Sequence, residues 1–149
     1  MKTIILIQVI AFLSYVIYVS RFRPYSISQS WYILQTENKG WLFTLFTWAI
    51  GLPVLFYGNV LFFLAGSFMC FVGVATRFKE KLEGWVHNVA TIVSIILSFA
   101  ATTYEGSWSG LYFFAVIVLG LFVFKADRKT WWIEITAFFC VMLSIYFIP

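Results

Sequence analysis

The chain has 149 residues, of which 62% are apolar and 22% aromatic, while Asp, Glu, Lys and Arg together supply only 11%. A soluble domain has about a quarter of its residues charged, so this composition excludes an ordinary water-soluble globule. Intrinsic disorder is excluded too, because disordered chains lack aromatic residues on the scale of the 18 Phe, 8 Tyr and 7 Trp found here. In a membrane protein the formal charge of +4 sets topology, and we expect no nucleic-acid partner.

Six apolar runs have about the length needed to cross the hydrocarbon layer, which takes about 17 to 25 helical residues. We therefore predict an all-α fold: a single transmembrane domain over residues 1–149, built as a polytopic bundle of six helices. The 36 residues from 41 to 76 are too long for one crossing, and Gly58-Asn59 is a turn dipeptide, so this run predicts a helical hairpin. The predicted helices cover residues 3–20, 41–57, 60–76, 85–104, 110–124 and 131–148.

The basic residues are distributed unevenly between the two ends of the predicted bundle. Nine of the ten Lys and Arg residues lie in the connections 21–40, 77–84 and 125–130. The positive-inside rule places these three connections in the cytoplasm and both termini on the non-cytoplasmic side. We expect a multi-pass protein of the cell inner (cytoplasmic) membrane. Its expected partners are membrane lipids and either a second copy of the chain or another membrane protein.

The fourth predicted helix carries a polar stripe. Its members follow one another at spacings of 4, 3, 4 and 4 residues, which places all of them on one helix face, turned away from lipid. One interpretation is a polar path or pocket with a titratable imidazole at its cytoplasmic mouth. The other, which we favour, is a close-packing interface whose hydroxyl groups bond backbone carbonyls of their own helix. The stripe consists of His87, Thr91, Ser94, Ser98 and Thr102.

Glu134 is the one carboxylate well inside a predicted helix, and we expect it at a depth similar to that of His87. A carboxylate and an imidazole at one depth can pair, relay a proton or hold the head group of a ligand. The alternative is a Glu134 hydrated from the cytoplasmic surface or paired with Arg128 or Lys129. Both interpretations remain open from the sequence.

The connection 21–40 contains a turn with three serines, Ser26, Ser28 and Ser30, followed by aromatic and aliphatic residues. This pattern predicts a short helix that lies in the membrane interface or under the bundle, with the serines as caps. A serine hydroxyl facing His87 would form a nucleophile and its base. Serines in such a turn are more often caps, so we assign no catalytic residue.

Metal and cofactor sites are not indicated. The chain has one His, and Cys70 and Cys140 are isolated within predicted helices, so neither a multi-His centre within one subunit nor a disulfide framework is expected.

Four segments resemble small uncharacterised polytopic membrane proteins from Bacteroidota and their phages. The resemblance spans most of residues 26–90 and implies a bacterial or phage origin, with no assigned activity. It directs attention to the serine turn and to His87. The segments that carry it are Ser26–Tyr32, Trp41–Phe43, Phe71–Ala75 and Val86-His87.

Three function classes follow from these observations. The leading hypothesis is a non-catalytic integral membrane protein, a subunit, anchor or regulator within the membrane, because little of the chain lies outside the bilayer and catalytic motifs are absent. The first alternative is a small channel or transporter with a polar path along the fourth helix. The second alternative is a lipid-modifying membrane enzyme, which requires the serine turn, His87 and Glu134 to converge.

Overall fold

The computed structural model describes residues 2–76 and 80–148, and within them it contains seven α-helices and no strand. The predicted all-α class is therefore confirmed for this part of the chain. The helices are α1 (Lys2–Ser20), α2 (Ser30–Gln35), α3 (Trp41–Val54), α4 (Val60–Val74), α5 (Lys81–Tyr104), α6 (Ser109–Val123) and α7 (Lys129–Tyr146).

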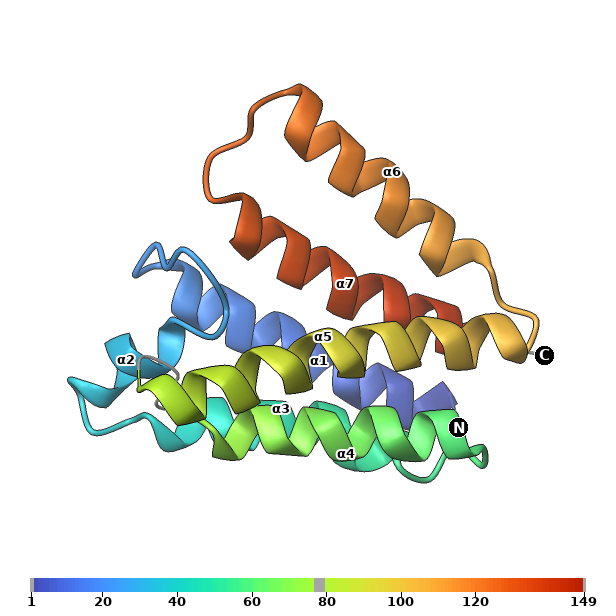
Figure 1. Ribbon diagram of the computed structural model, residues 1–149, viewed down its shortest axis with the longest axis horizontal. Coiled ribbons are helices and arrows are strands. Elements are labelled where there is room, and N and C mark those ends of the chain that lie inside the picture. The colour runs from blue at the N-terminus through green and yellow to red at the C-terminus, as the bar shows by residue number, and fades with distance from the viewer. Residues whose placement is uncertain (1, 77–79, 149) are drawn as a thin grey trace.

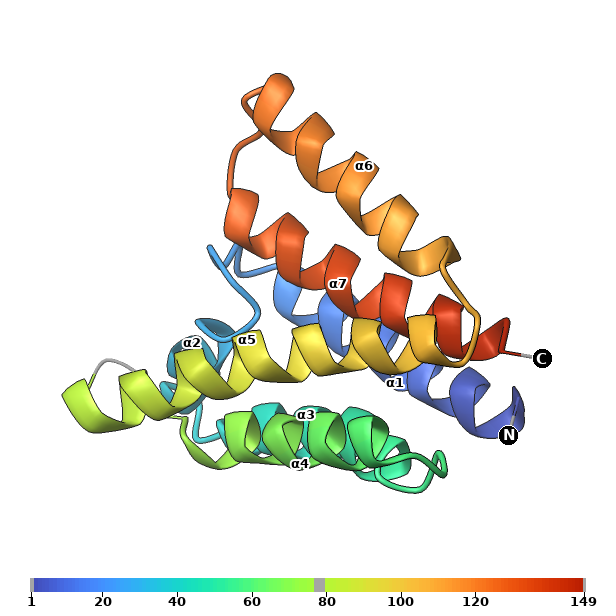
Figure 2. The ribbon, with the colours of Figure 1, turned by 45° about the vertical axis from the view of Figure 1, so that its right-hand side comes forward.

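The long helices run back and forth between two ends of the molecule (Figure 1). Both ends of the chain, the α3–α4 turn and the α5–α6 turn lie at one end, while the α1–α2 and α6–α7 connections lie at the other. Helix α4 packs against both α3 and α5, whereas α6 packs mainly on α7 and diverges from the rest of the bundle (Figure 2). This alternation is that of an up-and-down helical bundle.

The helices differ in whether they are long enough to cross a membrane. Only α1 and α5, among the helices of the described residues, are both long and apolar enough to cross one, judged by length and composition. Helices α3, α4 and α6 are apolar but shorter.

The two largest differences from the predicted helix ends have local reasons, and the other ends differ by two residues at most. Helix α3 ends at Val54, three residues before the predicted end, because the N–H groups of residues 55–57 bond carbonyls three residues back in a tighter turn. Helix α5 begins at Lys81, four residues before the predicted start. The charges there suggested a connection, but Lys and Glu are good helix formers, so charge does not end a helix.

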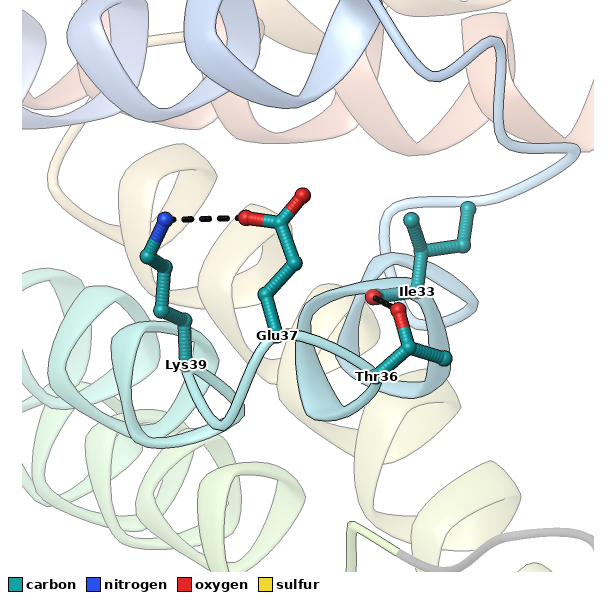
Figure 3. A network of polar contacts seen from close by, with 4 residues as sticks. All are labelled: Ile33, Thr36, Glu37 and Lys39. Carbon is teal, nitrogen blue, oxygen red and sulfur yellow. Dashed lines mark hydrogen bonds and ion pairs between the residues drawn. The ribbon is translucent and has the colours of Figure 1, made fainter.

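The short helix α2 belongs to the predicted cytoplasmic connection and lies under the bundle. Ser30 and Leu34 of α2 are 1% and 0% exposed, and α2 packs on α3. In the turn after α2, Lys39 Nζ donates to Glu37 Oε2 over 2.8 Å, and Thr36 Oγ1 donates to the carbonyl of Ile33 over 2.7 Å (Figure 3). The hydrogen bond and charge of Lys39 hold the pKa of the Glu37 carboxyl below its ordinary value. Because both side chains are exposed, this pair shapes the turn and adds little stability.

Glycines bring α3 and α4 into close contact. A Cβ atom at Gly66 of α4 would lie 2.6 Å from the carbonyl oxygen of Gly51 in α3, and a Cβ at Gly73 would meet Thr47 Oγ1. Polar bonds reinforce the contact, because Thr44 Oγ1 donates to the carbonyl of Gly73 over 2.8 Å. Small residues at a helix interface allow backbones to approach in this way.

This contact predicts the effect of adding one methyl group. Gly66→Ala places its Cβ against a backbone atom, so we expect the free energy of unfolding to fall by about 1 to 3 kcal/mol, as in other overpacked interfaces. Thermal unfolding in detergent measures the change. Gly120→Ala in α6 is the matched control, because its Cβ meets nothing within 4 Å and alanine favours a helix. Equal melting temperatures for the two variants would contradict the close packing described here.

Candidate functional site

The candidate site lies toward the end of the bundle where the α1–α2 connection meets the second turns of α5 and α7 (Figure 2). The three serines of that connection have different roles. Ser26 Oγ accepts a hydrogen bond from the Gln29 N–H at 3.0 Å, which is a capping role. Ser30 Oγ donates to the carbonyl of Ile27 and lies 2.5 Å from the hydroxyl of Tyr15. Ser28 is the serine that faces His87.

Ser28 and His87 form a directed pair. The Nε2 atom of His87 lies 2.7 Å from Ser28 Oγ, and its Nδ1 atom lies 2.9 Å from the carbonyl oxygen of Ala75, at the end of α4. A carbonyl can only accept, so in the neutral imidazole Nδ1 carries the proton and Nε2 accepts from the Ser28 hydroxyl. His87 is 2% exposed, whereas Ser28 is half-buried, so the pair lies at the edge of the buried interior.

Glu134 reaches the same turn from α7. Its Oε2 atom accepts a hydrogen bond from the Ile27 N–H, and the Ser28 N–H also bonds this carboxylate. Ser28 is therefore held through its side chain by α5 and through its main chain by α7. His87 and Glu134, which the sequence placed at one depth, meet through Ser28 and not directly.

The remaining members of the polar stripe on α5 point into the bundle. Thr91 Oγ1 donates to the carbonyl of His87 over 2.8 Å and Thr102 Oγ1 to that of Phe99 over 3.0 Å, both within their own helix. Ser94 Oγ donates instead across to the carbonyl of Ala65 in α4 over 2.9 Å. Ser98 is buried and lines a cavity. Two of these three hydroxyl groups thus bond within α5, and the third joins α5 to α4.

That cavity extends from the site into the bundle, between α1, α3, α4, α5 and α7. It is narrow, and the space that it offers to a molecule of the size of water is about 50 Å³. Ser28 and Glu134 contribute to its wall, and most of the remaining lining is aliphatic or aromatic.

Gln8, which was not among the predicted site residues, is 2% exposed and also lines the cavity. Its Nε2 atom donates to the carbonyl of Ile50 in α3 over 2.8 Å, while its Oε1 atom has no hydrogen-bond partner within the described chain. A signal was present, because Gln8 is the one carboxamide in the predicted first helix and polar side chains in such helices mark functional or packing contacts.

The structure was compared with the side-chain groupings that metal ions need. Within residues 2–76 and 80–148, no group of three His, Cys, Asp or Glu side chains could hold an ion. Comparisons with family models, with curated proteins and with solved structures find no match to the chain.

The position of Glu134 predicts a graded effect of its replacement. Glu134→Ala leaves the N–H groups of Ile27 and Ser28 without their acceptor, so we expect a loss of roughly 1 to 3 kcal/mol in the free energy of unfolding. Glu134→Gln keeps one oxygen acceptor and should lose less. Thermal unfolding in detergent gives both values, with Glu37→Ala as the exposed control. A Glu134→Ala variant as stable as the control would show that this carboxylate does not hold the turn.

Proposed function

We propose that this chain is a multi-pass integral membrane protein that acts without catalysis, as a subunit, anchor or regulator of other membrane proteins. In this proposal six helices cross the cell inner membrane and both termini face its non-cytoplasmic side. Membrane lipids surround the bundle, and a second copy or another membrane protein is its partner.

The observation that carries the proposal is the uncovered surface of α6. Of its fifteen residues only Gly110 is buried, and Phe113, Val116 and Leu119 are 57%, 67% and 66% exposed. A helix that is apolar all round and exposed to water would be a strong liability, whereas lipid chains solvate it. The same helix contributes no polar side chain to the candidate site, so its role is contact with lipid or with another helix.

The polar groups of the site support the non-catalytic part of the proposal. Ser26 caps a turn, Ser30 bonds Ile27 and Tyr15, and Glu134 bonds the main chain of the serine turn. Each of these bonds attaches the α1–α2 connection to itself or to the bundle. Side chains that already form hydrogen bonds within the chain stabilise the fold instead of acting on a substrate.

Six crossings are supported by the arrangement of the connections. Helices α3 and α4 have 14 and 15 residues, a rise of about 21 and 22 Å, which is less than a typical hydrocarbon layer. A bilayer that thins locally accommodates short helices at modest cost. The connections alternate between the two ends of the molecule, as repeated crossings require (Figure 1).

Cysteine accessibility tests the topology. In a variant with Cys70 and Cys140 replaced by Ala, a cysteine at Trp108 should react with a membrane-impermeant maleimide on intact spheroplasts. A cysteine at Thr36 should react only after permeabilisation, because its connection faces the cytoplasm. Both native positions are exposed, so burial does not limit either reaction. Reaction of both cysteines on intact spheroplasts, or the reverse order, would refute the proposed topology.

One observation favours a second candidate, a membrane-embedded ester hydrolase. The Ser28 hydroxyl donates to a neutral imidazole whose other nitrogen is held by a carbonyl, which is the geometry of an activated serine. Ser28 Oγ would attack the ester carbonyl carbon, and His87 would pass the hydroxyl proton to the departing alcohol. Water would then release the acid from Ser28. The Ser28 N–H, a donor suited to an oxyanion, is occupied by the Glu134 carboxylate, which favours the non-catalytic role.

Labelling with a fluorophosphonate separates the two candidates, because this reagent modifies only activated serines. The non-catalytic proposal predicts no labelling of the protein in liposomes. Labelling that Ser28→Ala and His87→Ala both abolish, and that Ser26→Ala leaves intact, would replace that proposal with the hydrolase.

A further inference from the structure

The net charge of the chain is concentrated in two connections, α1–α2 and α6–α7. Residues 21–25 and 125–129 contain five basic residues and one acidic residue, Asp127, so these two segments account for the whole formal charge of +4. Basic and acidic residues balance over the rest of the chain. We call the five basic residues the basic surface; they are Arg21, Arg23, Lys125, Arg128 and Lys129.

The fold brings these two connections together at one end of the bundle (Figure 1). Arg128 Nη1 donates to the carbonyl of Pro24 over 3.4 Å, a contact between residues 104 positions apart. No residue of the basic surface forms an ion pair with a carboxylate among residues 2–76 and 80–148, where the ion pair found is Lys39–Glu37. The positive charge of the two connections is therefore left for a partner outside the chain.

Aromatic rings place the basic surface at the level of lipid head groups. The guanidinium carbon of Arg21 lies 4.1 Å from the centre of the Tyr18 ring, and Lys129 Nζ lies 4.9 Å from the centre of the Phe122 ring. Phe124, at the end of α6, is 84% exposed. Aromatic and basic side chains together at helix ends are typical of the boundary between a membrane and water. This setting favours a lipid partner over an acidic protein segment.

Two of the five cations stand where the backbone favours glycine. Lys125 has a φ of +49°, its N–H bonds the carbonyl of Phe122, and the next N–H, of Ala126, bonds that of Leu121. This is the helix-ending turn in which glycine is the usual residue. Arg23 has a φ of +50°. The backbone needs neither cation, so their purpose lies in what the side chains bind.

We infer that the basic surface binds the phosphate groups of anionic phospholipids in the cytoplasmic leaflet. The acyl chains of these lipids lie against the exposed apolar side chains of α6. Each cation near an anionic head group strengthens binding about fivefold, and a head group without net charge gains none of this. The inference rests on the proposed function, which places these connections in the cytoplasm. It adds the class of lipid and the residues that select it.

Native mass spectrometry of the purified protein in a non-ionic detergent tests the inference. The protein is titrated with phosphatidylglycerol or with phosphatidylcholine of the same acyl chains. We expect phosphatidylglycerol to bind roughly tenfold more tightly or better, and the difference to shrink as the ammonium acetate concentration rises, because salt screens exposed charges. Equal affinities for the two lipids would overturn the inference.

A double variant separates lipid binding from folding. Arg23→Gly with Lys125→Gly removes two charges and relieves two left-handed backbone positions. Its affinity for phosphatidylglycerol should fall roughly tenfold or more, while its melting temperature does not fall. A double variant that binds phosphatidylglycerol as tightly as the wild type would overturn the assignment. If the double variant fails to fold, Lys129→Gln leaves the backbone unchanged and should lose about fivefold.

Two controls match the double variant. Asn38 has a φ of +57°, and the N–H of Lys39 after it bonds the carbonyl of Leu34, as in the turn at Lys125. Asn38→Gly therefore relieves the same backbone conformation without changing the charge, and lipid affinity should not change. Lys2→Gln removes a cation from the other end of α1 and should also leave the affinity unchanged. A loss in either control as large as in the double variant would contradict a specific site.

The outcomes distinguish this inference from the proposed function. A membrane-inserted protein with equal affinity for both lipids contradicts the lipid site and leaves the membrane proposal standing. If a poly-glutamate peptide binds the basic surface and phosphatidylglycerol is not preferred, the partner is an acidic protein segment and the inference is wrong. A protein that stays in solution without detergent contradicts the proposed function.

Discussion

The turn at Ser28 is the contact on which the arrangement of the bundle depends. It lies between the first and second helices, yet it is held by a histidine from α5 and a carboxylate from α7. Segments 59 and 107 residues apart in the chain are thereby joined within a single turn. Because both bonds use groups that are expensive to leave unpaired in an apolar environment, the turn has one favourable position. Ile27 and Ser28 of this turn also line the interhelical cavity.

The rest of the interior follows the same rule. Cross-helix bonds from Gln8, Thr44 and Ser94 end on carbonyls of neighbouring helices, and glycines let those helices approach. Many polar groups are thus bonded inside the molecule, while many large apolar side chains are exposed on its outside. Five buried side-chain oxygens of the described residues are exceptions, because they have no hydrogen-bond partner there: Gln8 Oε1, Tyr57 Oη, Ser107 Oγ, Ser109 Oγ and Ser144 Oγ. Helix α6 stands apart from this network, which explains why it can diverge from the bundle (Figure 2).

Much of the architecture could be predicted from the sequence, because it depends on local properties. Apolar runs separated by charge or by Gly-Asn predicted the helices, and the 4, 3, 4, 4 spacing on α5 predicted that its polar residues share one interior face. Four of the five are buried and Thr91 is half-buried. Helix ends were harder to predict from the sequence, since the start of α5 contains charged residues and the backbone at the end of α3 forms a tighter turn after Pro53. The role of Gln8 was missed, because its partner, the carbonyl of Ile50, is 42 residues away.

The sequence by itself determined the helical class, the membrane-like composition, the uneven placement of basic residues and the inward face of α5. All of these follow from hydrophobicity and helical periodicity, which act over a few turns. Only the tertiary structure decided which of three equivalent serines meets His87, that Glu134 bonds the main chain of the same turn, and that a cavity with an unpaired amide oxygen lies between the helices. Those outcomes depend on the packing of helices distant in the chain. Directional bonds of about 3 Å are formed or missed according to that packing, which no local pattern specifies.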